Sequence, residues 1–308
     1  MNTVTVLAPG LLTTVQDLGR EGYGAMGVSA SGAADALALR IGNKLLGNPE
    51  DAPALEMTLL GGAFQFSGET WVAISGSDFG ATLDGQSFAT HTVFKVQPRQ
   101  TLQFGPTKTG ARAYLCIRGG LDVPKVLGSR STHLLSGLGG WQGRALRKGD
   151  TLPIGSDSMC GTSADRSAVW KELEFNRDTI RVTKGPQWES FSESTRKQFF
   201  AQSYVITEET NRMGIRLRGT QHQLAGTEDM ITEGVSLGAI QVTPSGQPII
   251  LFVEQQTTGG YPKIANVISA DLSSVGQLRP RDEIRFELVS MVVARHRYVE
   301  QERFVIVV

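Results

Sequence analysis

The stretch Val4-Thr-Val-Leu-Ala-Pro-Gly10 (VTVLAPG) contains the pattern from which the fold can be predicted. It is a short segment with alternating β-branched residues, and a Pro-Gly pair ends it. The stretch Ile180–Pro186 (IRVTKGP) has the same layout, a short alternating segment followed by a Gly-Pro turn. Alternation with period two indicates a half-buried β-strand, and Gly and Pro end such strands. We therefore infer that the chain consists of two similar β-rich halves.

Further segments of the chain have the composition of short strands. They are rich in β-branched, aromatic or alternating residues, and turn-forming pairs such as Asp84-Gly85 and Gly259-Gly260 lie between them. Frequent short strands with such turns favour a sandwich or a barrel. The predicted strands are Thr3–Leu7, Ala63–Phe66, Trp71–Ser75, Ala113–Ile117, Ile180–Thr183, Ile249–Val253 and Glu283–Leu288.

Three helices are expected to interrupt the strands. The first has an apolar face at helical spacing and can begin at Ser31 or Gly32. In the second, Ser190 and Glu193 have the spacing of a capping box. The last residues of the third can form a strand instead. The predicted helices cover residues 33–46, a segment that begins at Ser190, and the segment from Ser290 to about Arg303.

One short pattern occurs three times. Each copy has an apolar residue, then a turn with basic residues and Pro or Gly, then an alternating strand. We interpret it as a repeated hairpin that reflects a duplicated β unit, with coincidence in a turn-rich protein as the alternative. The copies are Val96–Phe104, Leu146–Ile154 and Leu278–Phe286.

The boundary between the halves is expected within Ser156–Asp178, which mixes Gly, Ser, Asp and other charged residues. We predict domains at residues 1–165 and 166–308.

Composition excludes several classes of protein. The chain has 308 residues with 30 basic and 30 acidic side chains, so its formal net charge is zero. Balanced charge gives no electrostatic reason to expect a nucleic acid or an anionic membrane as a partner. No apolar run approaches the roughly 18 residues of a membrane helix, and we see no secretory signal. Cys116 and Cys160 lack metal-ligand spacing and cannot form a disulfide framework, so we expect a cytoplasmic protein.

Strong chemical signatures are missing from the sequence. There is no P-loop for ATP and no G-x-S-x-G nucleophile elbow. The four histidines are isolated from one another, so we expect no metal site. None of the lysines is flanked by Met, so no usual biotin attachment site is present.

Three polar clusters remain as candidate functional sites. The first runs from Thr13 to Gly22 and includes Gln16, Asp17 and Arg20. Its hydrogen-bonding groups beside glycines can form an anion-binding loop. The alternative is a structural loop in which Asp17 and Arg20 pair with each other or with the backbone.

The second cluster is Asn211–Leu217, in which Arg212 precedes a glycine. The planar guanidinium of Arg212 can hold a carboxylate or a phosphate, and Asn211 can contribute to binding. The alternative is an arginine at a strand end that covers apolar surface.

The third cluster, Glu254–Lys263, follows the predicted buried strand Ile249–Val253. Amides, hydroxyls, two glycines and a lysine at such a position favour ligand binding. Lys263 supplies a point charge, and Glu233 upstream can act as a base or as an orienting group. The alternative is a glycine hairpin with polar decoration. The candidate binding residues here are Gln255, Thr257, Thr258, Gly259, Gly260 and Tyr261.

With these clusters in this order along the chain, the sequence resembles the biotin-dependent carboxyltransferase family, also called allophanate hydrolase subunit 2. The resemblance extends over nearly the whole chain, and its motifs specify the family better than the substrate. The matching motifs are Gly10–Gly19 (GLLTTVQDLG), Gly27–Asp35 (GVSASGAAD), Gly119–Thr132 (GGLDVPKVLGSRST), Asn211–Leu217 (NRMGIRL) and Glu233–Ile264 (EGVSLGAIQVTPSGQPIILFVEQQTTGGYPKI).

The resemblance implies a mainly β fold, with two cyclophilin-like β-barrel subdomains and a few short helices. It also implies protein partners. Stand-alone bacterial members of the family include one component of ATP-dependent 5-oxoprolinase, which works with two others, a cyclophilin-like B component and a TIM-barrel-type A component. In urea carboxylase relatives the same module is fused to biotin carboxylase and biotin carrier segments, and these 308 residues contain neither.

The resemblance implies cleavage of 5-oxoproline to L-glutamate, through phosphorylation of the lactam oxygen by ATP with Mg²⁺. Arg20, Arg212 and Lys263 would supply positive charge, and the Gly259-Gly260 backbone would donate hydrogen bonds. Asp17 or Glu233 would accept a proton. Two alternatives stay open at this point. One is a carboxyltransferase that uses a separate biotin carrier and urea or a similar amide. The other is a non-catalytic regulator of a sporulation-type histidine kinase pathway that binds the cyclophilin-like B component.

Overall fold

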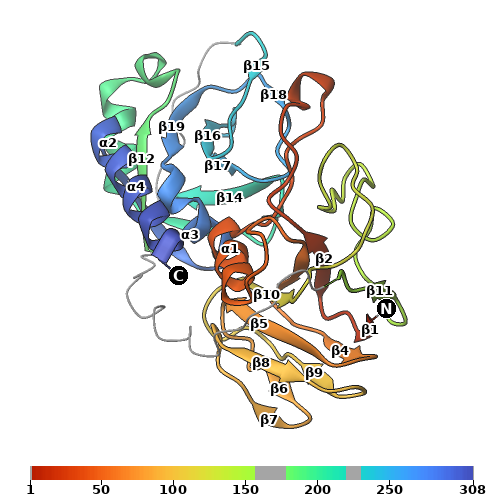
Figure 1. Ribbon diagram of the computed structural model, residues 1–308. Coiled ribbons are helices and arrows are strands. Elements are labelled where there is room, and N and C mark those ends of the chain that lie inside the picture. Colours follow the sequence, from red (N-terminus) through yellow and green to blue (C-terminus); the bar gives the residue numbers. More distant parts are fainter. Residues whose placement is uncertain (1, 157–177, 220–229, 308) are drawn as a thin grey trace. The chain divides into compact units, whose positions relative to one another are not determined.

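The computed structural model describes residues 2–156, 178–219 and 230–307 and is mainly β (Figure 1). The described residues divide into two compact units. The first contains residues 2–20 and 31–156, and the second contains residues 21–30, 178–219 and 230–306. The predicted boundary between residues 165 and 166 lies outside the described residues. The prediction of a mainly β chain is confirmed.

The first unit contains two antiparallel sheets. The six-stranded sheet has the order β11 (Thr151–Pro153), β1 (Thr3–Ala8), β4 (Ala63–Phe66), β9 (Thr101–Gln103), β6 (Thr82–Leu83) and β7 (Gln86–Ser87). The five-stranded sheet has the order β2 (Leu12–Gln16), β3 (Ala54–Thr58), β10 (Arg112–Ile117), β5 (Thr70–Gly76) and β8 (Val93–Val96).

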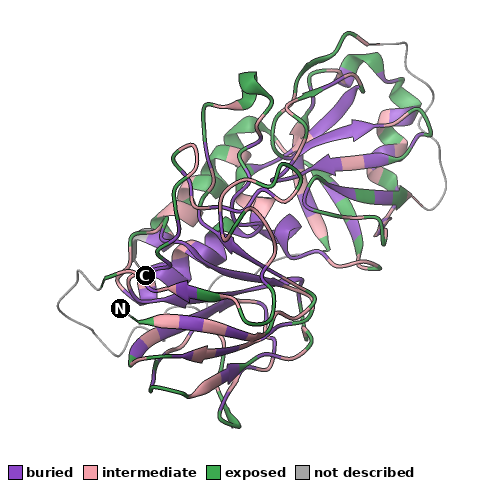
Figure 2. Ribbon diagram, turned by 90° about the vertical axis from the view of Figure 1, so that its right-hand side faces the viewer, coloured by how far each residue is buried: buried purple, intermediate pink, exposed green. Residues whose placement is uncertain are grey.

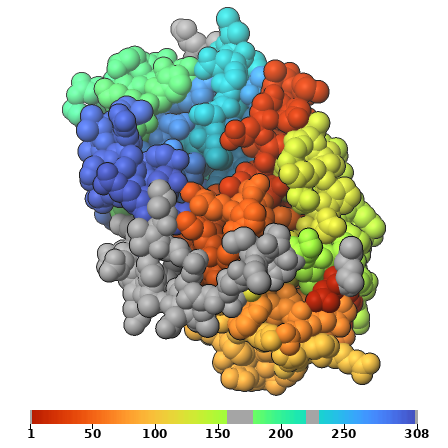
Figure 3. Space-filling view, in the orientation of Figure 1, coloured from red at the N-terminus to blue at the C-terminus, as the bar shows by residue number. Residues whose placement is uncertain are grey.

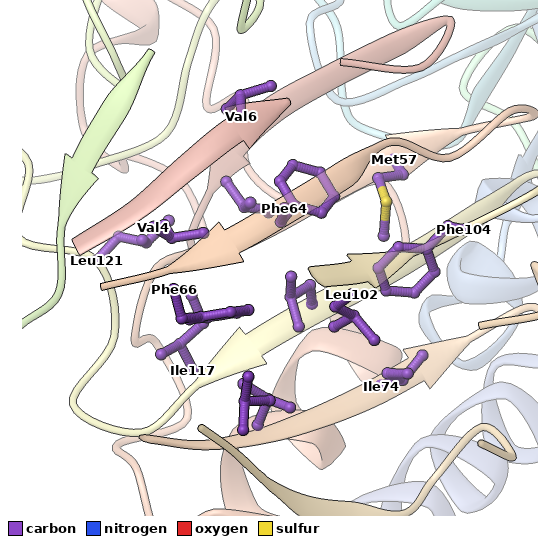
Figure 4. Packing of buried hydrophobic residues seen from close by; sticks show 14 of the residues in the cluster. Val4, Val6, Met57, Phe64, Phe66, Ile74, Leu102, Phe104, Ile117 and Leu121 are labelled. Carbon is purple, nitrogen blue, oxygen red and sulfur yellow. The ribbon is translucent and has the colours of Figure 1, made fainter. Parts of the chain in front are cut away.

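A single hydrophobic core lies inside this unit. Val4 and Phe64 are fully buried in it together with Leu102 and Ile117, so both sheets contribute side chains (Figure 4). The alternation predicted for Val4–Gly10 explains how β1 contributes to this core, because a strand with period two places every second side chain on the core face.

Helix α1 (Ala36–Leu45) packs against β5 and β10. It begins one turn later than predicted, because Asp35 is its N-cap and accepts a hydrogen bond from the Ala38 amide at 2.9 Å. Gly42 lies inside the helix, where an added Cβ would come within 2.6 Å of the side chains of Cys116 and Ser75. The glycine therefore allows the helix to approach the sheet.

The second unit is built on a closed seven-stranded barrel. Around the barrel the strands are β12 (Thr179–Lys184), β19 (Lys263–Val267), β16 (Ala239–Val242), β17 (Pro248–Leu251), β14 (Gly214–Gly219), β13 (Tyr204–Ile206) and β20 (Glu283–Leu288). Only the β12–β20 pair is parallel among these barrel pairs. A separate two-stranded ribbon consists of β15 (Glu233–Gly234) and β18 (Thr258–Gly259). Many residues of these strands are buried, and they are drawn in purple in Figure 2.

The helices of the second unit are α2 (Glu193–Ala201), α3 (Leu272–Gly276) and α4 (Met291–Val307), and the short 3₁₀ helices are Gly24–Met26, Trp188–Ser190 and Ser269–Asp271. Ser192, not Ser190, caps α2 by accepting a hydrogen bond from the Thr195 amide at 3.1 Å, so the predicted capping box is wrong. Much of α4 is exposed, and it lies on the surface drawn in blue in Figure 3. Among the described residues, no helix combines the length and the apolar composition needed to cross a membrane.

The two stretches that suggested duplicated halves form corresponding strands. β1 and β12 have the same length and the same sequence of buried and partly buried residues. Val4 and Val6 in β1, and Ile180 and Val182 in β12, are completely buried. The two strands differ in one respect, because β1 pairs antiparallel with β11 whereas β12 pairs parallel with β20.

The pattern that occurs three times forms the same four-residue turn in each copy. The amide of the fourth residue bonds to the carbonyl of the first at 3.1–3.2 Å, and the side chain of the fourth accepts from the amide of the first at 2.7–2.8 Å. The third residue has a positive φ between 67° and 92°. The turns are Gln97–Gln100, Arg147–Asp150 and Arg279–Asp282.

Each turn is followed by a strand. The turn is hydrogen-bonded to the same neighbouring strand with which the following strand pairs. The third-residue amides bond at 2.8 Å to carbonyls in β4, β1 and β13, and the strands that follow are β9, β11 and β20. The hairpin interpretation is wrong, because β8 and β9, which flank the first turn, belong to different sheets.

Candidate functional site

The clearest polar site of the second unit is the ion pair between Lys263 and Glu233. Lys263 is the first residue of the barrel strand β19, and its side chain is only 2% exposed. Glu233 begins the ribbon strand β15, and its side chain is 44% exposed. The Lys263 Nζ lies 2.5 Å from Glu233 Oε1. The structure therefore brings together a buried cation and an accessible carboxylate that lie 30 positions apart in the sequence.

Gln187 connects both members of this pair and was not among the predicted site residues. Its Nε2 donates to Glu233 Oε1 at 2.8 Å, and its Oε1 accepts from the backbone amide of Lys263 at 3.1 Å. Its own amide donates to the Lys263 carbonyl at 3.2 Å. The available signal was its position directly after the Gly185-Pro186 turn, at the end of the strand β12.

The two donors act on the ionisation of Glu233. The hydrogen bond from Lys263, and after it the one from Gln187, hold the pKa of the Glu233 carboxyl below its ordinary value. Both donors use Oε1, and within the described residues Oε2 accepts no hydrogen bond. The site thus presents an ionised carboxylate with one oxygen available to a ligand or to a water molecule.

A layer of amide side chains lies beside the ribbon. Gln256 Nε2 donates to Gln241 Oε1 at 3.2 Å, and Gln241 is 2% exposed in the middle of β16. An added Cβ at Gly259 would come within 2.5 Å of Gln241 Nε2 and 2.7 Å of Gln256 Nε2. A larger residue at position 259 would therefore displace the ends of these two glutamine side chains. Gln241 was missed by sequence reasoning, although a glutamine inside the apolar segment AIQV is a usable signal.

The remaining residues of the third cluster lie in or near the same ribbon. Thr258 pairs with Gly234, and the Thr257 carbonyl accepts from the Val235 amide at 3.1 Å. Gln255 Nε2 donates to the Val235 carbonyl at 3.1 Å. The side chain of Tyr261 is 43% exposed, and Gly260 links it to the ribbon. The predicted buried strand ahead of them ends at Leu251, two residues earlier than expected.

Arg212 and Glu254 form a second, fully buried pair in the same barrel unit. Arg212 Nε lies 2.5 Å from Glu254 Oε1, and the two side chains are 6% and 3% exposed. The Glu254 amide also donates to the Arg212 carbonyl at 2.9 Å. Asn211 caps the adjacent turn, because its Oδ1 accepts from the Met213 amide at 2.8 Å. The guanidinium of Arg212 thus has a carboxylate of the chain itself as a partner.

Asp17, Arg20 and Gln16 belong to the first unit, where they join β2 to the segment 129–132. Asp17 accepts hydrogen bonds from the hydroxyls of Ser129 and Ser131 and from the amides of Gly19 and Arg130, at 2.5–2.8 Å. Arg20 Nη2 donates to the Ser131 carbonyl at 2.5 Å, and Gln16 Nε2 donates to the Thr132 carbonyl at 3.1 Å. All three side chains are buried. These contacts connect β2 and the loop after it to a segment that lies about 110 positions later in the chain.

Other chemistries find little support in the described residues. No group of three or more His, Cys, Asp or Glu side chains in this part of the chain is arranged to hold a metal ion. Burial raises the pKa of the Cys116 thiol to about 12, which leaves it unreactive as a nucleophile. Cys160 and His222 lie outside the described residues. The lysine best placed for chemistry, Lys263, is engaged with Glu233 and lacks the surroundings of a biotin attachment site.

Comparison with known proteins identifies the family. The family model "Carboxyltransferase domain, subdomain A and B" matches residues 26–288. The chain belongs to this carboxyltransferase family. It is 38% identical over 299 residues to the C subunit of the 5-oxoprolinase of Escherichia coli strain K12, a match that covers 97% of this chain and 95% of that protein.

Larger members of the carboxyltransferase family contain a related segment. The chain is 36% identical to the urea amidolyase of Saccharomyces cerevisiae over 95% of its length, but it spans 17% of that protein. The crystal structure of the Kluyveromyces lactis urea amidolyase superposes with a TM-score of 0.91, at 36% identity, over 98% of this chain and 20% of that chain. The resemblance to the carboxyltransferase family predicted from the motifs is confirmed.

Proposed function

We propose that this protein is the C subunit of an ATP-dependent 5-oxoprolinase. The observation that carries the proposal is the match to the E. coli protein of that name, which extends along nearly the full length of both proteins. The name of that relative implies further subunits. We propose the cyclophilin-like B component and the TIM-barrel-type A component as the partners, and the cytoplasm, where ATP is available, as the compartment.

The proposed reaction overcomes the low reactivity of a lactam. The lactam oxygen attacks the γ-phosphorus of ATP, and ADP leaves. Water then adds to the ring carbon, the C–N bond breaks, and the nitrogen takes up a proton to become the amine of γ-glutamyl phosphate. A second water hydrolyses this acyl phosphate to L-glutamate and phosphate. One lactam, one ATP and two waters are consumed in each turnover.

The Glu233–Lys263 pair fits the addition of water. Oε2 of Glu233 is free to accept a proton from the attacking water, while Lys263 and Gln187 hold Oε1 and thereby fix the direction of Oε2. Lys263 also brings positive charge close to the site where the tetrahedral carbon develops negative charge. Thr258, Gly260 and Tyr261 lie close by in the sequence and can contact the substrate. Mg²⁺ and ATP enter as co-substrates of the complex, and we assign them no residue of this chain.

The roles of Asp17, Arg20 and Arg212 follow from their partners. Asp17 has four donors around it, and we propose that it anchors the loops of the first unit, while Arg20 supports the same loops through Ser131. Arg212 is poorly suited to a mutational test of catalysis. Removing one member of a buried pair costs roughly 3–5 kcal/mol of folding free energy, so lost activity would not report on chemistry.

The second candidate is a carboxyltransferase that acts on urea or a similar amide with biotin on a separate carrier. The urea amidolyase matches favour it. When bound, the biotin of that carrier would supply a carboxyl group, and the residues of this chain would orient the acceptor amide.

An assay of the complex of all three components tests the proposal. The complex should release L-glutamate from 5-oxoproline with consumption of ATP, and no single component should do so. Glu233→Gln should lower kcat by about 10²-fold or more, the usual contribution of a general base. Lys263→Met, which keeps an apolar chain of similar length, should have an effect of similar size. Glu209→Gln and Lys148→Met change exposed residues and serve as matched controls.

One result would contradict the role proposed for Glu233, and another would contradict the proposed reaction. Full activity of folded Glu233→Gln would remove this residue from the mechanism without affecting the assignment of the reaction. Absence of glutamate release by the wild-type complex, together with carboxylation of urea when a biotinylated carrier is added, would favour the second candidate.

A further inference from the structure

A cavity of about 400 Å³ in the first unit shares no lining residue with the Glu233–Lys263 site. It lies between the turn that follows α1, the segment 119–125, Arg130, and Gly155-Ser156 at the end of the described segment. Its volume is within the range of about 300–1,000 Å³ that is usual for small-molecule sites. Its size therefore suits a compact metabolite.

The walls of the cavity are fixed by hydrogen bonds of the chain itself. The Asn48 side chain donates to the Ile117 carbonyl at 2.8 Å and accepts from the Gly119 amide at 2.9 Å. The Gly155 amide donates to the Gly120 carbonyl at 3.0 Å. A cavity with a wall held in this way can accept a ligand without reorganisation of the backbone.

Charged side chains of both signs line the cavity, namely Asp51, Asp122, Lys125 and Arg130. Within the described residues, the carboxylates of Asp51 and Asp122 and the ammonium of Lys125 have no ion pair or hydrogen bond. Charged groups around a cavity that are not paired with one another remain available to a ligand.

Arg130 is the best positioned of the four. Its amide donates to Asp17 Oδ2 at 2.5 Å, and its Nε donates to the Val123 carbonyl at 2.9 Å. These two bonds fix the direction of the guanidinium. Its terminal nitrogens make no hydrogen bond to the described part of the chain, so they can bind a carboxylate with two parallel hydrogen bonds.

We propose that this cavity binds a zwitterionic α-amino acid. The carboxylate of the ligand would pair with Arg130 and Lys125, and its ammonium group would pair with Asp51 and Asp122. A purely anionic ligand would meet two carboxylates, and a purely cationic ligand would meet two cations. A ligand that carries both charges on neighbouring atoms complements all four side chains. The site is independent of the reaction proposed above.

Ligand-observed NMR titration of the intact chain tests the proposal with L-glutamine as the probe. Glutaramate lacks the ammonium group of the probe, and 4-aminobutanamide lacks its carboxylate. L-Glutamine should bind, and each analogue should bind at least about tenfold more weakly, because one pair of charged contacts is lost. Lys125→Gln and Asp122→Asn should each weaken the binding of L-glutamine several-fold. Both residues are exposed, and their side chains make no hydrogen bond or ion pair within the described chain, so the variants should fold.

Lys148→Gln is the matched control, because Lys148 is an exposed lysine of the same unit that does not line the cavity. It should bind L-glutamine like the wild-type chain. The proposal is overturned if the wild-type chain does not bind L-glutamine, or if Lys125→Gln and Asp122→Asn bind it unchanged. Equal binding of glutaramate and L-glutamine would show a site for anions and would also overturn it.

Discussion

The two oxygens of the Glu233 carboxylate have different surroundings. Lys263 and Gln187 both donate to Oε1, and Oε2 accepts nothing from the described residues. Donors to an ionised carboxylate stabilise its charged form, which is why the pKa of Glu233 is lowered. Glu233 therefore stays ionised to a lower pH than an ordinary glutamate. Any activity that requires this charge should persist as the pH falls through the ordinary range of glutamate titration.

Substitution of Gln187 tests this arrangement at the level of one residue. In Gln187→Leu, one of the two donors to Oε1 is lost, so the pKa of Glu233 should rise toward its ordinary value of 4.5. The ionised form would then be lost at a higher pH than in the wild-type chain. Carboxyl-carbon NMR titration measures this directly, with Gln247→Leu, an exposed glutamine, as the control. An unchanged pKa of Glu233 in Gln187→Leu would show that Gln187 does not act on the carboxylate.

At the residue scale the sequence selected candidate residues but could not predict their contacts. Lys263 could be selected because a polar cluster after a buried strand favours ligand binding, and Glu233 because it offers a carboxylate upstream of that cluster. Gln187 could not be selected, because an isolated glutamine after a turn has no distinguishing pattern. The partners of Asp17 and Arg212 are likewise set by contacts between distant segments, and a pattern of neighbouring residues cannot show those contacts.

At the scale of elements, the repeated turn starts three strands by the same arrangement. Its third residue needs a positive φ, and this position is occupied by Arg99, Gly149 and Arg281. Side chains disfavour this conformation because Cβ approaches the following carbonyl, at a cost of about 1–2 kcal/mol. The turns with Arg99 and Arg281 therefore have a strained backbone at the position where the other turn has Gly149.

Reciprocal substitutions at these positions should differ in their effect on stability. Gly149→Ala should lower the free energy of unfolding by about 1 kcal/mol, because φ is 92° and an added Cβ meets no atom within 4 Å. Arg99→Gly should be neutral or slightly stabilising, since it relieves strain but adds freedom to the unfolded chain. Urea denaturation of both variants measures the difference. A stability of Gly149→Ala equal to that of the wild-type chain would show that the turn tolerates a side chain at this position without strain.

Element types were predicted more accurately than their ends and connections. The three long helices were predicted from periodicity and a capping-box spacing. Asp35 and Ser192, rather than the predicted residues, cap two of them, because the cap depends on which side chain reaches a free amide. Helix α3, Leu272–Gly276, is too short to produce a periodic signal. The recurring pattern was recognised, but local sequence does not determine which strand pairs with which.

At the scale of the whole molecule, each unit has a hydrophobic core of its own. In the first unit Phe66 is 1% exposed among side chains of both sheets. In the second unit Phe199 is fully buried and stacks on Phe286 with ring centroids 4.8 Å apart. The two halves could be predicted because the sequences of β1 and β12 have the same pattern. That one half forms two sheets while the other closes into a barrel follows from long-range pairing.

Separate cores should respond separately to large-to-small substitutions. Phe66→Ala and Phe199→Ala should each cost about 3–5 kcal/mol, the usual range for a buried phenylalanine. Hydrogen exchange should show the largest loss of protection in β1 and β4 for the first variant, and in β13 and β20 for the second. Equal loss throughout the chain in either variant would show that the two cores unfold as one cooperative unit.

The short ribbon that carries Glu233 has a consequence for how such a protein can change during evolution. Lys263 belongs to the barrel, whereas the acid opposite it belongs to a two-residue strand in register with Thr258 and Gly259. Because side chains alternate along a strand, a single insertion or deletion in the ribbon would turn the acid away and present another residue to the lysine. Selection can therefore exchange the acidic partner while the scaffold stays intact, which provides a route by which related modules diverge in the molecules they accept.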